Sequence, residues 1–133
     1  EFGVSVIDIP KTGAAGGLAG VLLVAGAELV EGFDFIAQEI CLDELMIDSD
    51  LVITGEGFLD STSFDGKVIS GICRYADTFS VPVFVIAGDI SPEIVGKVEG
   101  VSLVEAFGKE RAFSETELCI ERTVIEHMDS LSR

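Results

Sequence analysis

Two short apolar runs without a polar interruption constrain the fold of this chain more than any other feature. They cover residues 51–54 and 83–87, and each is followed at once by a glycine and an acidic residue. Runs of this length are typical of central parallel strands that are covered on both faces. Residues 66–79 lie between them and place apolar side chains on one helical face, which predicts a βαβ unit. A third strand is expected over residues 101–104.

The stretch before these strands is richer in glycine and predicts further elements. Alternating apolar residues over 4–9 predict a strand, and residues 13–17 predict a tight turn into a buried helix that ends near Leu29. Residues 31–45 carry apolar side chains at helical spacing with acids between them. This pattern predicts one amphipathic helix or two short ones.

The part of the chain after the second apolar run predicts two helices. Ser91 and Pro92 are suited to the N-cap and first position of a short helix that ends at Gly96 or Gly100. Residues 114–117 have the spacing of a capping box and predict the start of a final helix. The apolar residues expected on one side of that helix are Ile120, Val124, Met128 and Leu131.

The charge of the chain excludes two classes of partner. Its 133 residues contain 8 Lys and Arg against 24 Asp and Glu, so the formal net charge is −16 at pH 7. Nucleic acid and anionic membranes repel such a chain. The longest uncharged stretch, residues 13–27, is shorter than the roughly 20 residues that cross a bilayer and is broken by glycines, so no membrane span is predicted.

The 133 residues of the chain allow one compact domain or one and a half small ones. Hydrophobic residues make up 48% of the chain, which is enough for a core. Cys41, Cys73 and Cys119 lie far apart without a Cys-x-x-Cys pair, which indicates an intracellular protein. His127 is the single histidine and is expected at the edge of the apolar stripe of the last helix rather than in a metal site. The chain begins without methionine, which indicates that the natural N-terminus lies upstream.

The densest group of chemistry-bearing residues follows the first apolar run. Residues 54–67 hold glycines, three carboxylates, several hydroxyls and a lysine. Ligands of open α/β sheets bind beyond the carboxyl ends of the strands, so this segment is the first candidate for a site. Glu56 or Asp60 is suited to take a proton or to hold Mg²⁺ through water, and Lys67 is suited to neutralise a phosphate. Free amides near Gly66, at the start of the expected helix, favour an anion.

A purely structural interpretation of the same glycines and acids stays open. The acids can cap helices, and the glycines can serve turns. Gly66 and Lys67 do not form a P-loop, because Ser61 stands where that motif requires glycine and no Ser or Thr follows Lys67. Residues 13–20 do not match Gly-x-Gly-x-x-Gly, so close packing of a helix against a strand explains the first glycine cluster equally well.

Several stretches also carry a family resemblance when their order and spacing are considered together. They are GAAGGL at residues 13–18, GAELV at 26–30 and DLVITGEG at 50–57, followed by Asp60 and by Gly66-Lys67. In this arrangement they resemble the C-terminal part of the glycerate kinase family, over nearly the whole chain.

The resemblance implies both an activity and a domain organisation. The implied enzyme phosphorylates D-glycerate to 2-phosphoglycerate with ATP and Mg²⁺ in the cytoplasm. The implied fold is α/β, with residues 46–133 forming the C-terminal half of a Rossmann-like parallel-sheet domain and residues 1–45 forming the tail of a second, inserted α/β domain. The missing N-terminal part of the same polypeptide would supply the rest of the site, so this portion alone is expected to be inactive. The picture is compatible with a homo-oligomer.

The resemblance further implies roles for individual residues. Glu56, Asp60 and Lys67 are the expected catalytic residues, and Glu56 and Asp60 are the expected Mg²⁺ ligands. The expected substrate-binding positions are Gly13, Ala14, Ala15, Gly16, Gly17, Gly55, Gly57, Ser61 and Gly66.

One departure from the family pattern leaves a second function open. Where the family usually has an arginine, this chain has Phe58, and no nearby Lys or Arg replaces that cation in sequence. The alternative is a non-catalytic or degenerate kinase-related α/β module that binds a partner chain, with Phe58 as an apolar contact at a loop tip. A flavodoxin-like protein is a weaker third choice, because an acidic loop is poor for the flavin phosphate.

Overall fold

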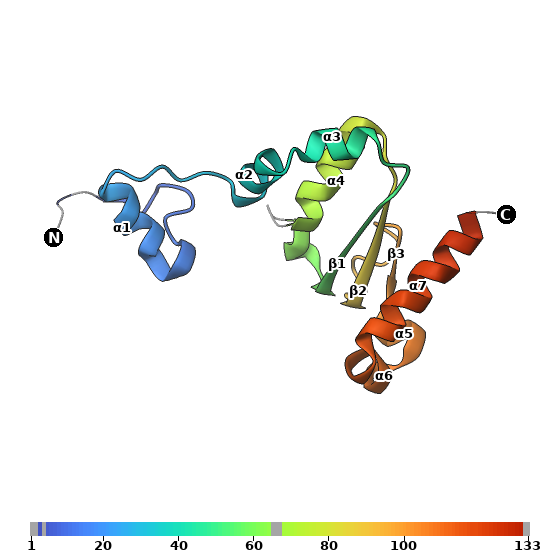
Figure 1. Ribbon diagram of the computed structural model, residues 1–133. Coiled ribbons are helices and arrows are strands. Elements are labelled where there is room, and N and C mark those ends of the chain that lie inside the picture. The colour runs from blue at the N-terminus through green and yellow to red at the C-terminus, as the bar shows by residue number, and fades with distance from the viewer. Residues whose placement is uncertain (1–2, 4, 65–67, 132–133) are drawn as a thin grey trace.

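The computed structural model describes residue 3, residues 5–64 and residues 68–131, apart from the side chain of Leu131 (Figure 1). Gly66 and Lys67 therefore lie outside the described residues. The elements are η1 (Ala14–Gly17), α1 (Leu18–Val24), α2 (Gly32–Glu39), α3 (Leu42–Ile47), β1 (Val52–Leu59), η2 (Ser61–Phe64), α4 (Val68–Phe79), β2 (Val83–Ile90), β3 (Gly100–Ser102), α5 (Leu103–Phe107), α6 (Lys109–Ser114) and α7 (Thr116–Leu131).

The sheet has three strands in the order β1-β2-β3, and both neighbouring pairs are parallel. Helix α4 connects β1 to β2, so the predicted βαβ unit is confirmed. The fold is α/β, and its parallel sheet flanked by helices corresponds to a Rossmann-like half-domain, as expected. In Figure 1, α4 lies on one side of the strands, and α5 and α7 lie on the other.

Strands β1 and β2 are longer than predicted, because both continue through their glycines. β1 runs to Leu59, so residues 55–59 belong to a strand and not to the expected loop. A Cβ atom at Gly55 would lie 2.5 Å from the carbonyl oxygen of Ile86, and one at Gly88 would lie 2.4 Å from that of Gly57. These glycines therefore allow β1 and β2 to approach each other closely, and they do not terminate the strands.

The third strand and the segment before it also differ from expectation. β3 ends at Ser102, whose Oγ accepts a hydrogen bond from the Glu105 amide at 3.1 Å and so caps α5. Residues 92–97 form consecutive turns instead of the predicted short helix. Gly96 has φ +80°, a left-handed conformation that is incompatible with a continuing helix.

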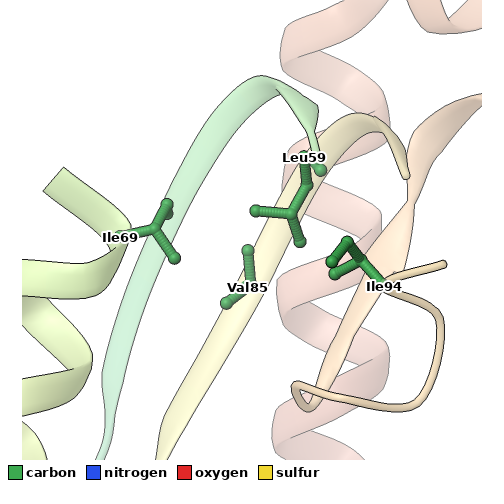
Figure 2. Close-up of a cluster of buried hydrophobic side chains, with 5 residues drawn as sticks. Leu59, Ile69, Val85 and Ile94 are labelled. Atoms are coloured by element: carbon green, nitrogen blue, oxygen red, sulfur yellow. The ribbon is translucent and has the colours of Figure 1, made fainter. Parts of the chain in front are cut away.

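Two hydrophobic clusters cover the sheet. The first contains Leu59, Val85 and Ala87 from the strands, together with Ile69 of α4 and Ile94 of the turns (Figure 2). The second packs α5, α6 and α7 against β2, and its buried members are Phe84, Ile86, Leu103, Ala112 and Cys119. Because β2 contributes to both clusters, it is the central strand in packing as well as in sheet order.

The last helix begins at Thr116, but the predicted capping box does not form. Ser114 ends α6, and its Oγ donates to the carbonyl of Glu110 at 2.9 Å. The predicted apolar stripe is buried only in part: Val124 packs against the second cluster, whereas Ile120 is 40% exposed and Met128 is 46% exposed. Among the described side chains of α7, the buried ones are Cys119 and Thr123. The predicted stripe follows hydrophobicity, whereas the buried face is set by a small cysteine and by a threonine whose Oγ1 donates to the carbonyl of Cys119.

His127 lies inside α7 and is partly buried, as expected for a residue at the edge of the apolar stripe. Its ring stacks on Phe84 at a centroid distance of 3.7 Å and an interplanar angle of 9°. Its Nε2 lies 4.0 Å from Glu99 Oε1. The contact with Phe84 gives the histidine a packing role.

The N-terminal part differs most from expectation. Residues 5–9 do not form the predicted strand: residues 7–8 form a turn and residue 9 a bend, while residue 4 lies outside the described residues. Helix α1 ends at Val24, and Leu18 and Val21 are about half exposed, so the predicted buried helix is both shorter and more exposed. In Figure 1, α1 lies apart from the sheet beyond an extended segment. The alternative of two short helices over residues 31–45 is confirmed by α2 and α3.

No helix among the described residues is long and apolar enough to cross a membrane.

Candidate functional site

The exits of the three parallel strands gather carboxylates and hydroxyls at one edge of the sheet. Asp60 follows β1, Asp89 is the last residue but one of β2, and Ser102 ends β3. At this edge Leu59 of β1 pairs with Ile90 of β2, and Ser102 of β3 pairs with Ala87 of β2. Parallel strands present their carboxyl ends together, and this edge is where open α/β sheets bind ligands. The candidate site predicted from the sequence therefore lies at a suitable place in the fold.

Asp60 is held in a fixed orientation by its own turn. Its Oδ1 accepts from the amide and from the hydroxyl of Thr62, both at 2.8 Å. Its amide donates to Ser63 Oγ at 3.2 Å, and Ser63 is fully buried. Ser61 is exposed at the start of η2, beside this turn. An oriented carboxylate needs little reorganisation before it acts on a cation or a substrate hydroxyl.

Glu56 lies inside β1 and pairs with Ala87 of the central strand. Its Oε2 is buried and has no hydrogen-bond partner among the described residues. A buried carboxylate oxygen without a partner is costly, so this atom is suited to receive a cation or a hydroxyl donor from outside the described residues. The extended strand places the Cα atoms of Glu56 and Asp60 up to about 13 Å apart. Water or substrate phosphates would therefore have to bridge the gap if both carboxylates act on one Mg²⁺ ion.

Within the described residues, no three His, Cys, Asp or Glu side chains lie together as a metal site. Mg²⁺ differs from most protein-bound metals in this respect, because it keeps several waters and is held by one or two carboxylates together with substrate phosphates. A single oriented carboxylate such as Asp60, or the unpartnered Oε2 of Glu56, fits that mode of binding.

The sequence analysis did not predict the hydrogen-bonded pair formed by Asp89 of β2 and Ser102 of β3. Asp89 Oδ1 accepts from the Ser102 hydroxyl at 3.0 Å and from the amide of Ile90 at 2.9 Å. Asp89 thereby connects the exits of the two strands. The sequence does contain a signal for Asp89. One glycine separates it from the second apolar run, just as one glycine separates Glu56 from the first run.

A cation near η2 was also missed. Arg74 of α4 lines a pocket of about 380 Å³ together with Phe64 of η2, and it forms an ion pair with Asp34. The sequence showed no Lys or Arg near Phe58, but a helix returns residues three or four positions apart to the same face. Ser70 and Arg74 of α4 have that spacing, and it was the signal available in the sequence.

The glycines of residues 13–17 are not brought to the carboxyl edge of the sheet (Figure 1). Gly13 and Ala14 are exposed. Ala15, Gly16 and Gly17 have φ values of 52°, 66° and 93°, so this stretch is a left-handed turn before α1. Its expected role in substrate binding remains a prediction. Gly55 and Gly57 lie in β1, where Gly55 allows the close approach of β2.

Cys73 is expected to be an unreactive thiol. Burial, and secondarily the charge of Asp77, raise the pKa of Cys73. Because the thiolate is the nucleophile, a raised pKa keeps this side chain protonated at pH 7 to 8. We expect iodoacetamide to alkylate Cys73 at least about tenfold more slowly than the exposed Cys41, as followed by peptide mass spectrometry. Equal alkylation rates at the two cysteines would contradict this expectation.

A comparison with known protein families shows which family the chain belongs to. The model of the glycerate kinase family matches residues 1–129, which is nearly the whole chain. The chain belongs to the glycerate kinase family. No solved structure matches it significantly.

Curated relatives of this glycerate kinase family member agree with the assignment. The chain is 38% identical to "Glycerate kinase" of Halalkalibacterium halodurans over 115 residues, which cover 86% of the chain and 28% of that relative. It is 41% identical to "Glycerate 2-kinase" of Escherichia coli over 92 residues, which cover 68% of the chain and 24% of that relative. The chain thus spans about a quarter of the length of the curated relatives it matches.

Proposed function

We propose that the full-length protein containing this chain is a glycerate kinase, which transfers the terminal phosphoryl group of ATP to D-glycerate with the help of Mg²⁺. The observation that carries this proposal is the oriented carboxylate of Asp60 at the carboxyl edge of a parallel sheet, in a chain of the glycerate kinase family. The names of the curated relatives support the substrate. The proposed location is the cytoplasm, where ATP is available.

The proposed roles follow from the demands of phosphoryl transfer. The metaphosphate-like transition state needs positioning and neutralisation of charge more than covalent chemistry. Mg²⁺, when bound, neutralises charge on the phosphates. Asp60 would hold that ion directly or through water, and the unpartnered Oε2 of Glu56 would accept the proton of the acceptor hydroxyl or complete the ion's ligands. Lys67 and the amide of Gly66 would hold an anionic group of the substrates.

The remaining parts of the site would come from outside this half-domain. We propose that residues 46–133 form half of the catalytic domain, and that residues 1–45 belong to a second domain, whose turn at residues 13–17 would face the cleft in the full-length protein. The preceding part of the polypeptide would complete the site. The short match to the relatives supports this division, since about three quarters of each relative lies outside it.

Product analysis tests the proposed reaction, including which hydroxyl is phosphorylated. The full-length protein is incubated with ATP, Mg²⁺ and D-glycerate, and the product is followed by phosphorus-31 NMR with proton coupling. Phosphate on the secondary hydroxyl couples to one carbon-bound proton and gives a doublet, which is the expected result for 2-phosphoglycerate. A triplet would identify the 3-phospho product, and the absence of any new phosphomonoester would refute the kinase proposal.

Phe58 is the observation that favours the alternative of a partner-binding module. It is 51% exposed, although it lies in β1 beside Asp89 and not at the predicted loop tip. An exposed aromatic side chain on an edge strand is suited to contact another chain or another part of the same polypeptide. Nucleotide binding without glycerate-dependent release of ADP would favour this module over the kinase.

A further inference from the structure

A pocket of about 320 Å³ opens beside the candidate site, at the carboxyl ends of β2 and β3. Its walls come from the end of β2, from the turns of residues 92–97 and from α5. Its size lies near the lower end of the roughly 300 to 1,000 Å³ range of small-molecule sites. The apolar side chains that form most of its lining include Ile90, Ile94, Val95, Val98 and Val101.

The charge at this pocket selects the kind of group that fits. Glu105 is the one ionisable residue among the described residues that line it, and it is exposed. The Ser102 hydroxyl is already used, because it donates to Asp89 and accepts from the Glu105 amide. A carboxylate at the rim of an apolar pocket repels phosphate and glycerate, which are both anions. It favours an uncharged, flat or apolar group that carries hydroxyl donors.

The pocket is also at a suitable distance from the predicted phosphoryl-transfer residues. Ile90 lines it and pairs with Leu59, the residue directly before Asp60. β1 and β3 are separated by β2, so Asp60 and the far wall of the pocket are about two strand spacings apart, or about 10 Å. A nucleotide has its uncharged nucleoside at one end and its terminal phosphate at the other, and it is long enough to bridge this interval.

We propose that this pocket holds the nucleoside of ATP, with the base against the apolar wall and Glu105 accepting a hydrogen bond from a ribose hydroxyl. The proposal rests on the proposed kinase function for its choice of nucleotide. The nucleoside is the one uncharged portion of the two substrates, so it is the portion that the carboxylate rim admits. The terminal phosphates then extend toward Asp60.

A bulky substitution tests occupancy of the pocket. Val95 is 63% exposed, so Val95→Trp fills the pocket without disturbing the core, and Ile125→Trp on α7, where Ile125 is 53% exposed, is the matched control. In the full-length protein we expect Val95→Trp to raise the KM for ATP at least about tenfold, with the KM for D-glycerate within about twofold of the unmodified protein. Ile125→Trp is expected to change neither value more than about twofold. An unchanged KM for ATP in Val95→Trp would overturn the proposal.

A second experiment tests the ribose contact. Hydrogen bonds to charged groups contribute enough to change affinity by about tenfold or more. We expect the unmodified protein to bind 2′-deoxy-ADP or 3′-deoxy-ADP about tenfold more weakly than ADP, and Glu105→Gln to remove most of that difference. Glu110→Gln, an exposed position on α6, is expected to retain it. Equal discrimination in the Glu105→Gln and Glu110→Gln variants would contradict a role for Glu105.

Direct binding separates this inference from the proposed function. ADP binding to the full-length protein is measured by calorimetry, which needs no glycerate turnover. Loss of ADP affinity in Val95→Trp together with absent glycerate phosphorylation would retain the nucleoside pocket and reject the glycerate kinase. Glycerate phosphorylation with unchanged ADP affinity in both the Val95→Trp and the Glu105→Gln variants would retain the kinase and reject the pocket.

Discussion

Replacing Asp60 with asparagine in the full-length protein is expected to lower kcat for glycerate-dependent ADP release by about 100-fold or more. The substitution keeps the size of the side chain and leaves an oxygen that can still accept from the amide and hydroxyl of Thr62, so the turn is retained. It removes the negative charge that would hold Mg²⁺ or orient the acceptor hydroxyl. Groups that act on charge or protons in the transition state contribute about 100-fold to 10,000-fold to rates.

A matched control and a folding measurement make the Asp60 result interpretable. Asp129→Asn removes a charge from an exposed position on α7 and is expected to leave kcat within about twofold. Circular dichroism and the denaturation midpoint of Asp60→Asn should match those of the unmodified protein. If turnover by a folded Asp60→Asn variant stays within about threefold, a loss below roughly 0.7 kcal/mol, Asp60 has no catalytic role.

Replacing Gly88 with alanine is expected to destabilise the protein by about 3 kcal/mol, the upper part of the usual range for overpacking. The added Cβ would lie 2.4 Å from the carbonyl oxygen of Gly57 on the neighbouring strand. That oxygen belongs to backbone and cannot rotate away, so the two strands would have to separate. Urea denaturation of the full-length protein, followed by circular dichroism, gives the shift in midpoint and in the free energy of unfolding.

Gly57→Ala is the control for this prediction, because the two glycines lie on paired strands but differ in their surroundings. A Cβ at Gly57 meets nothing within 4 Å. We expect its effect on the free energy of unfolding to stay within about 1 kcal/mol. Equal stability of the Gly88→Ala and Gly57→Ala variants would show that the close approach of β1 and β2 is not a constraint on the fold.

The sequence predicted the centre of the fold better than its boundaries. The βαβ unit followed from two apolar runs and a helical spacing between them, and both signals report burial directly. The ends of β1 and β2 could not be predicted in the same way. Gly55 and Gly88 are indistinguishable from turn glycines in sequence, and the carbonyl oxygens that require them belong to a neighbouring strand.

The two ends of the chain show a different limit of sequence-based prediction. Hydrophobic periodicity predicted burial for Ile120 and Leu18, yet both side chains are substantially exposed in this structure. Periodicity identifies a face that is able to be buried, but not whether a packing partner is present among the described residues. About three quarters of the length of each curated relative lies outside the match. The corresponding part of a full-length protein is a source of such packing partners.

The candidate site was predicted in part. Asp60 was predicted as a site residue after the first strand, and it lies at the carboxyl edge of the sheet. Glu56 was predicted for the same loop, but it lies inside β1, because the strand does not end at Gly55. Asp89 and Arg74 were missed, since the first acts across two strands and the second approaches η2 through the turn of a helix.

The most direct test of the glycerate kinase proposal is ADP release from ATP and Mg²⁺ with D-glycerate. It is measured under the same conditions on this 133-residue chain and on the full-length polypeptide. The account predicts glycerate-dependent ADP release by the full-length protein and none by the chain alone, because the site needs residues from outside the chain. Absence of glycerate-dependent ADP release in a folded full-length protein would contradict it.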